Sequence, residues 1–229
     1  EAELKEALLL LEKQDGYAVQ DKCQGSFLDY VNHMWPEFIC GRHHQIFAEK
    51  LEQVAKGEIK RLIVNMPPRH TKSEFASTYF PSWMMGQNPK MKIMQTTHTG
   101  ELAVRFGRKV RNLMAQKEYK QVFPDVSLQA DNKSAGRWET NKGGEYFAAG
   151  VGGAVTGRGA DLLIIDDPHS EQDALSPTAL ESAYEWYTSG PRQRLQPKGS
   201  IVLVMTRWST IDLTAKLLQS QKEPLADQW

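Results

Sequence analysis

The sequence predicts one α/β domain in which helices cover both faces of a mainly parallel β-sheet. Several short segments are continuously apolar, above all residues 62–64, 162–165 and 201–205. Apolar runs without alternating polar residues are typical of strands buried on both faces of a parallel sheet. Segments with helical periodicity separate these runs, which is the pattern of repeated strand–helix units. The 229 residues contain no internal repeat or low-complexity linker, so we expect a single domain.

Charge, cysteine content and the length of the apolar runs limit the kinds of partner and site that this chain can have. Lys plus Arg and Asp plus Glu each total 28, so a nucleic acid would have to bind a local basic surface. Cys23 and Cys40 are too few for a disulfide scaffold and fit a reducing compartment, and no histidine–cysteine spacing suggests a zinc cage. No apolar run reaches membrane-spanning length and no signal peptide is visible, so we expect no membrane partner. The chain begins without Met, and we expect it to be a piece of a longer protein.

The first quarter of the chain is predicted to be helical. Leucines within residues 1–14 suggest a short amphipathic helix, and Ser26 is a suitable N-cap for a helix over 27–31. A clearer helix over 43–55 has its apolar residues on one stripe. The first core strand, 61–65, follows it.

Helices and strands alternate after this strand. The predicted helices cover residues 73–85, 100–116, 177–189 and 210–220, the last opened by Ser209 or Thr210. The predicted strands are 92–96, 162–165 and 201–205, with an antiparallel hairpin over 134–150.

The loop after the first strand resembles a phosphate-binding loop. A strand, a tight turn and then Lys72-Ser73 at a helix start place unpaired N–H groups and about half a positive charge beside an anion. Lys72 would reach the β- and γ-phosphates, and the Ser73 hydroxyl would bind Mg²⁺. The standard pattern has glycine where this chain has Met66 and Thr71, and a β-branched residue resists positive φ. An ordinary strand-to-helix turn is therefore the alternative.

Two carboxylates follow the most apolar strand. At its end, beside the lysine loop, Asp166 could hold Mg²⁺ and Asp167 could orient or deprotonate an attacking water. The alternative is that these acids only cap the next turn, since Asp-Asp-Pro is a good turn opener. The upstream Lys72-Ser73 favours the first interpretation.

Taken together, these motifs resemble the ATPase domain of the large terminase subunit of tailed bacteriophages, the motor that pumps DNA into capsids. The resemblance rests on residues 67–74, 157–169 and 205–208, in the family's order, and spans most of the chain. It implies a P-loop NTPase fold of the additional-strand type with an antiparallel hairpin insertion, and ATP and Mg²⁺ as cofactors. It also divides the chain into N-terminal helices, 1–57, and a P-loop core, 58–229.

The resemblance assigns roles to particular residues. It implies a loop with an internal arginine in which the essential lysine is Lys72, the ATP-binding residues being Pro68, Arg69, His70, Thr71, Lys72 and Ser73. Ser73 and Asp166 would hold Mg²⁺. Asp167 stands where the family commonly has a catalytic glutamate, which leaves Glu171 as another candidate.

Three residues outside the loop complete the expected site. Arg158 falls where the family places an arginine thought to reach a neighbouring subunit's ATP, so it competes with Arg69 as the arginine finger. Thr206 falls at the coupling motif that senses the γ-phosphate, and Gln45 at the adenine-contacting glutamine.

A basic helix face could contact DNA phosphates, although such faces are often simply solvated; it consists of Arg105, Arg108, Lys109 and Arg111. The implied partners are double-stranded DNA, further copies of the chain in a ring, a portal protein and a small terminase subunit. The implied location is the host cytoplasm, with transient docking on the procapsid. We expect the family's C-terminal nuclease domain to be absent and DNA cleavage to be lacking.

Two other functions fit the same residues. One is another translocase or helicase of the additional-strand class, although no tandem second motor domain is evident. The other is a nucleotide-binding assembly module that no longer hydrolyses ATP, which Thr71 and Asp167 keep open.

Overall fold

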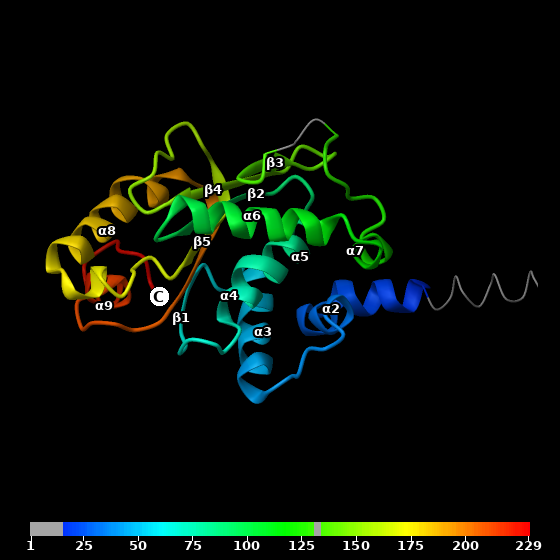
Figure 1. Cartoon of the computed structure of the whole chain (residues 1–229), viewed down its shortest axis with the longest axis horizontal. Helices are drawn as coiled ribbons and strands as arrows, with labels where there is room; N and C mark the ends of the chain where they lie inside the picture. The colour runs from blue at the N-terminus through cyan, green and yellow to red at the C-terminus, as the bar shows by residue number, and fades with distance from the viewer. Residues whose placement is uncertain (1–15, 131–133) are drawn as a thin grey trace, which may run out of the picture.

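A central β-sheet organises the computed structural model, which describes residues 16–130 and 134–229 (Figure 1). The strands are β1 (Arg61–Asn65), β2 (Lys92–Thr97), β3 (Arg137–Glu139), β4 (Glu145–Gly150), β5 (Ala160–Asp166) and β6 (Leu195–Met205). Their order across the sheet is β1-β6-β5-β2-β4-β3. Neighbouring strands are parallel from β1 through β4, whereas β3 pairs antiparallel with β4. The expected mainly parallel sheet with an antiparallel hairpin is thus confirmed.

Helices connect these strands, and a helical segment over residues 16–25 precedes them. The α-helices are α2 (Phe27–Met34), α3 (Arg42–Ala55), α4 (Lys72–Glu74), α5 (Phe80–Gln87), α6 (Gly100–Met114), α7 (Lys117–Val122), α8 (Pro177–Ser189) and α9 (Leu213–Ser220). A π-helical turn, η1 (Phe75–Tyr79), joins α4 to α5. Two 3₁₀ turns, η2 (Asp173–Leu175) and η3 (Pro191–Arg194), flank α8. Among the described residues, no helix is both long and apolar enough to cross a membrane.

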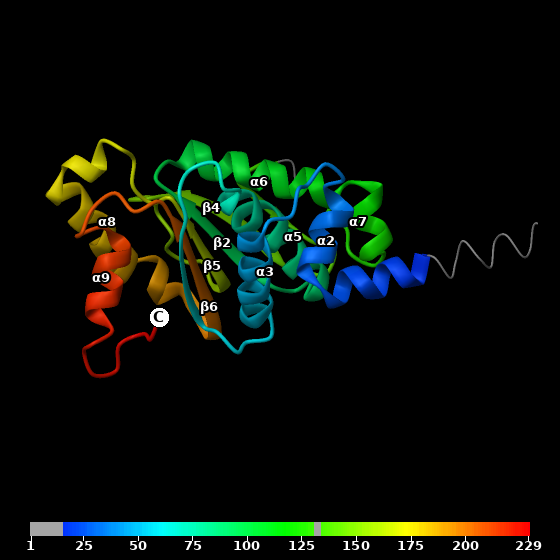
Figure 2. The same ribbon diagram turned by 90° about the horizontal axis from the view of Figure 1, so that it is seen from below.

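Two hydrophobic cores lie on opposite faces of the sheet. Successive strand residues point to opposite faces, so Leu162 and Ile164 pack with α2, α3, α5, α6 and α7. Leu163 and Ile165 pack on the other face with Tyr187 of α8 and with α9. Figure 2 shows α8 and α9 on one side of the strands and α3 and α5 on the other. The continuous apolar run of β5 therefore reflects burial on both faces.

Strand β6 lies between β1, which leads into the lysine loop, and β5, which ends in the carboxylates. This insertion is the additional strand that the resemblance implied. Most predicted boundaries agree within two residues, and Ser26 caps α2 by accepting from Asp29 N–H.

The starts of α9 and β6 were predicted wrongly, and one helix, α7, was missed. Helix α9 begins at Leu213, because the Asp212 side chain accepts from Ala215 N–H and outcompetes Ser209 and Thr210 as the N-cap. Strand β6 begins at Leu195, six residues before its apolar run, because the earlier residues still pair with the sheet. The short α7 was not predicted. The helix expected over 1–14 lies outside the described residues.

Candidate functional site

Several predicted site residues lie together at the carboxyl ends of the parallel strands. Strands β1, β6 and β5 are neighbours and parallel, so their ends meet at this edge. Strand β1 leads through residues 66–71 into α4, β5 ends in Asp166, and β6 ends just before Thr206. In open α/β sheets, ligands bind in the crevice outside the carboxyl ends of the strands.

Lys72 lies at the centre of this edge. Its Nζ is 2.9 Å from Asp167 Oδ2 and donates to Thr206 Oγ1 at 3.1 Å. Thr206 N–H in turn donates to Asp167 Oδ1 at 2.7 Å. The Lys72 side chain is only 7% exposed, so its charge is balanced mainly by Asp167. Three residues from the ends of different strand–loop segments, Lys72, Asp167 and Thr206, thus form one closed polar group.

Asp166 lies beside this group and is buried. Ser73 Oγ donates to its Oδ1 at 2.9 Å and Ser77 Oγ to its Oδ2 at 2.6 Å. Burial raises the pKa of Asp166 to about 7, although the hydrogen bond from Ser77 opposes this rise. Ser73 and Asp166 present adjacent oxygen donors, the ligand type that Mg²⁺ prefers, so the predicted pair fits a magnesium ion.

Ser77 lies in the π-helical turn η1, four residues after Ser73, so both serines face Asp166. Phe80 N–H donates to Phe75 O, five residues back, which widens the helix at this point. Pro81 follows directly; it has no N–H, and its ring would clash with the Ser77 carbonyl in a regular α-helix. Such turns are frequent at functional sites. Ser77 was missed by sequence analysis, and the signal was its position four residues after Ser73 on the same helix.

The loop between β1 and α4 has an unusual backbone. Arg69 and Thr71 of this loop have φ values of 64° and 60°, in the region that favours glycine, and so does Asp167 after β5, at 41°. Each such residue costs on the order of 1–3 kcal/mol, and such strain clusters at functional sites. The first N–H groups of α4 have no partner further up the helix and are therefore suited to bind an anion.

Other predicted loop residues are exposed. His70 Nδ1 lies 2.9 Å from Pro68 O. Within residues 16–130 and 134–229, the Arg69 guanidinium forms no hydrogen bond or ion pair. A salt bridge from Arg69 to Glu74, its simplest structural role, does not form, because Lys109 of α6 pairs with Glu74 instead.

Arg158 lies at the opposite, amino end of the parallel strands, just before β5. It precedes β5, whereas Asp166 ends that strand, so about 20 Å of strand separates the two. Its Nη1 is 2.8 Å from Glu145 Oε1, and its guanidinium stacks over the Phe147 ring at 4.8 Å. The structure therefore does not bring Arg158 to the Lys72 of its own chain.

The remaining candidates lie at different distances from the loop. Gln45 is exposed on α3, next to His44, whose ring contacts Thr71. Glu171 lines a cavity of about 440 Å³ together with His98, Asp167 and Trp208. Of the α6 cations, Arg105 and Arg108 are exposed and Arg111 is partly buried, while Lys109 is engaged by Glu74.

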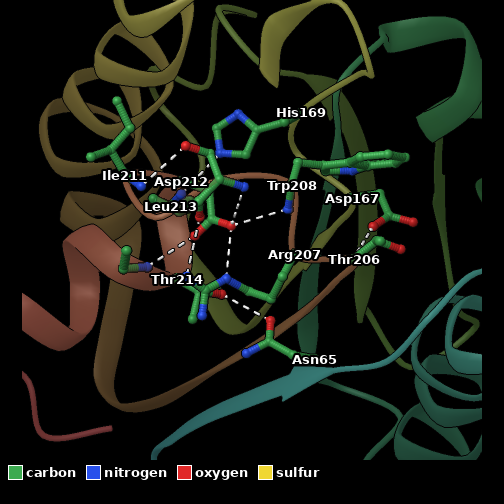
Figure 3. Close-up of polar contacts among 12 residues, drawn as sticks. Asn65, Asp167, His169, Thr206, Arg207, Trp208, Ile211, Asp212, Leu213 and Thr214 are labelled. Carbon is green, nitrogen blue, oxygen red and sulfur yellow. Dashed lines mark hydrogen bonds and ion pairs between the residues drawn. The ribbon is translucent and has the colours of Figure 1, made fainter. Parts of the chain in front are cut away.

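Asp212 fixes the segment that carries Thr206 (Figure 3). This fully buried carboxylate accepts from Arg207 Nε at 2.8 Å and from the Ala215 N–H at 3.1 Å. Leu213 N–H donates to His169 Nε2 at 3.0 Å, which ties α9 to the segment after β5. Thr206 is thus held on a braced segment between β6 and α9. Asp212 was not predicted, because its carboxylate is an ordinary N-cap in the sequence.

Comparison with known proteins addresses the fold. No protein-family model matches the sequence, and no curated protein matches it. Among solved structures, the HK97 bacteriophage large terminase aligns with a TM-score of 0.58 at 12% sequence identity. The chain shares the fold of this terminase. The alignment covers 86% of the present chain and 42% of the HK97 chain, so the present chain spans less than half the length of that terminase.

Proposed function

We propose that this chain is the ATP-hydrolysing domain of a motor that drives double-stranded DNA into a viral procapsid. The observation that carries the proposal is the contact of Lys72 with Asp167 and Thr206, beside the Ser73–Asp166 pair. A lysine, two acids and a polar strand-end residue at one edge of an additional-strand sheet suit phosphoryl transfer. The terminase-like fold supports this assignment over an unrelated nucleotide enzyme.

In this proposal, ATP binding rearranges the Lys72 contacts. The phosphates bind the N–H groups of residues 69–73, and Lys72 turns from Asp167 toward the β- and γ-phosphates. The release frees Asp167 to orient the attacking water and accept its proton. Ser73 and Asp166 would hold Mg²⁺, which neutralises charge on the phosphates. Thr206 then loses its hydrogen bond from Lys72. The segment held by Asp212 transmits the resulting shift of Thr206 to α9.

The arginine finger is assigned to a neighbouring subunit. Arg158 lies too far from its own Lys72 to act in the same chain, and its partner Glu145 is the first residue of β4, at the end of the strands away from the lysine loop. In a ring of copies, this edge of one subunit would face the loop of the next. Arg69 is the competing candidate, because it lies in the loop and is unpaired among the described residues. An arginine finger contributes about 10³–10⁵ in turnover.

The wider setting is proposed from the resemblance. Residues 1–57 provide the adenine side through Gln45, and residues 58–229 the P-loop core. The exposed Arg105 and Arg108 contact DNA phosphates without reading sequence. A portal protein and a small terminase subunit would complete the machine in the host cytoplasm, at the procapsid.

The test is Mg-ATP turnover per chain measured as the protein concentration rises. Specific activity that rises with concentration and is lost in both Lys72→Ala and Arg158→Ala supports a site completed between subunits. Constant activity that survives Arg158→Ala contradicts the assignment in trans and transfers the role to Arg69, with Arg69→Ala as the matched variant. ATP binding without turnover at any concentration, with and without added DNA, would instead indicate the non-hydrolysing module.

A further inference from the structure

Thr71 occupies the position at which a phosphate loop ordinarily has glycine. Its φ of 60° and ψ of 11° are left-handed, and it is the residue that precedes α4. A β-branched residue in this conformation is a true outlier and persists only where the surroundings hold it. A contact with the loop must therefore stabilise the left-handed conformation of Thr71, which glycine would adopt without strain.

His44 of α3 provides that contact. Its Nε2 lies 2.5 Å from Thr71 Oγ1, and Thr71 Oγ1 donates to His70 O at 2.7 Å. Gly41 N–H donates to His44 Nδ1 at 2.9 Å. Because Nδ1 accepts, the proton of the neutral ring is on Nε2, and Nε2 donates to the threonine hydroxyl. The donor and acceptor of each of these three hydrogen bonds are therefore mutually consistent.

The His44 ring is also held in place by its neighbours. It is 6% exposed, stacks on Phe75 at 5.2 Å between centroids, and meets Phe38 edge-on at 4.8 Å. Burial, then the nearby His43 and His70, lower the pKa of His44, so the ring is neutral at neutral pH. The donor to Thr71 is therefore rigid and correctly protonated.

We propose that His44 is a positioning residue for the phosphate loop, whose hydrogen bond to the Thr71 side chain holds that residue left-handed and so replaces the missing glycine. The bond presents the N–H groups at the start of α4 to the phosphates before ATP arrives. This inference rests on the proposed function for its role in ATP binding, but the bond itself can be tested without ATP.

The test in ATP is a double-mutant cycle between His44 and Thr71. His44→Asn retains an acceptor for Gly41 N–H but is too short to reach Thr71, so Kd for Mg-ATP should rise about five- to tenfold, as for the loss of one hydrogen bond. In Thr71→Gly, which needs no support, His44→Asn should change Kd less than twofold. His44→Gln, whose amide can reach Thr71, should restore affinity. Equal losses in both backgrounds, or no loss in either, would overturn the inference.

A measurement without nucleotide separates this inference from the proposed function. Ring ¹⁵N spectra of His44 should show the Nε2–H tautomer, and the Thr71 backbone shifts should be left-handed in the native chain and altered in His44→Asn. If these hold while ATP does not bind, the His44 contact stands and the ATPase proposal fails. An Nδ1–H tautomer, or Thr71 shifts unchanged in His44→Asn, would refute the contact.

Discussion

Removal of the Ser77 hydroxyl tests the geometry around Asp166 without any ligand. Ser77 is fully buried and donates to Asp166 Oδ2 at 2.6 Å, while Gln95 Nε2 donates to Ser77 Oγ at 3.1 Å. Hydrogen bonds to a charged group contribute about 1.5–3 kcal/mol. For a chain of this size, each kcal/mol shifts the melting temperature by about 2–4 °C. Ser77→Ala should therefore lower it by about 3–12 °C.

The assay is thermal and guanidinium unfolding at pH 8, above the Asp166 pKa of about 7, so that the carboxylate is ionised. Ser82→Ala is the matched control. Ser82 is equally buried and follows on the next helical turn, but its partners are the neutral Tyr30 hydroxyl and Tyr79 carbonyl. It should cost only about 0.5–1.5 kcal/mol. If Ser77→Ala is no more destabilising than Ser82→Ala, Asp166 is not the buried charged partner described above.

The remaining predictions concern two carboxylates that pair with arginines, Asp212 and Asp227. Asp212→Asn keeps an oxygen for the Ala215 N–H but removes the charge that accepts from the partly exposed Arg207, so it should destabilise the chain by about 1.5–3 kcal/mol in chemical unfolding; an effect below about 0.5 kcal/mol would show that the segment after β6 is not braced by this charge. Burial alone would raise the pKa of Asp227, but hydrogen bonds from Arg61 and Arg192 hold it below its usual value. The stabilisation is therefore present above pH 4 or so and lost as pH falls further, since protonation then removes the bridges. Asp227→Asn should lower the melting temperature at pH 7 and have little effect near pH 2; an equal effect at both values would refute the pairing.

Much of the fold was accessible from the sequence because local pattern and tertiary role agree in it. The strands 61–65 and 162–165 are apolar throughout because both faces of the sheet are covered, and 177–189 has both a serine cap and helical periodicity. Lys72, Ser73, Asp166 and Thr206 lie at strand ends, where the parallel topology brings them together. Their convergence was therefore predictable once the strands were known.

What could not be predicted depends on contacts between distant segments. His44 was predicted only to lie within the helix over 43–55, and nothing local shows that its ring meets Thr71, 27 positions away. Ser77 donates to Asp166, 89 positions away, and nothing local shows that the helix carrying it packs against the end of β5. The Arg158–Glu145 pair likewise depends on where β4 and β5 begin. These features arise from packing and not from local propensity.

In the proposed function, Lys72 leaves Asp167 and binds the phosphates of ATP. Calorimetric titration of Mg-ATP into the native chain and into Lys72→Ala tests this step. Lys216→Ala is the control, because that lysine also pairs with a carboxylate, Glu181, but joins α9 to α8 away from the loop. We expect one ATP to bind per chain in the native protein and in the control, and no measurable binding in Lys72→Ala. Equal affinity in all three would contradict it.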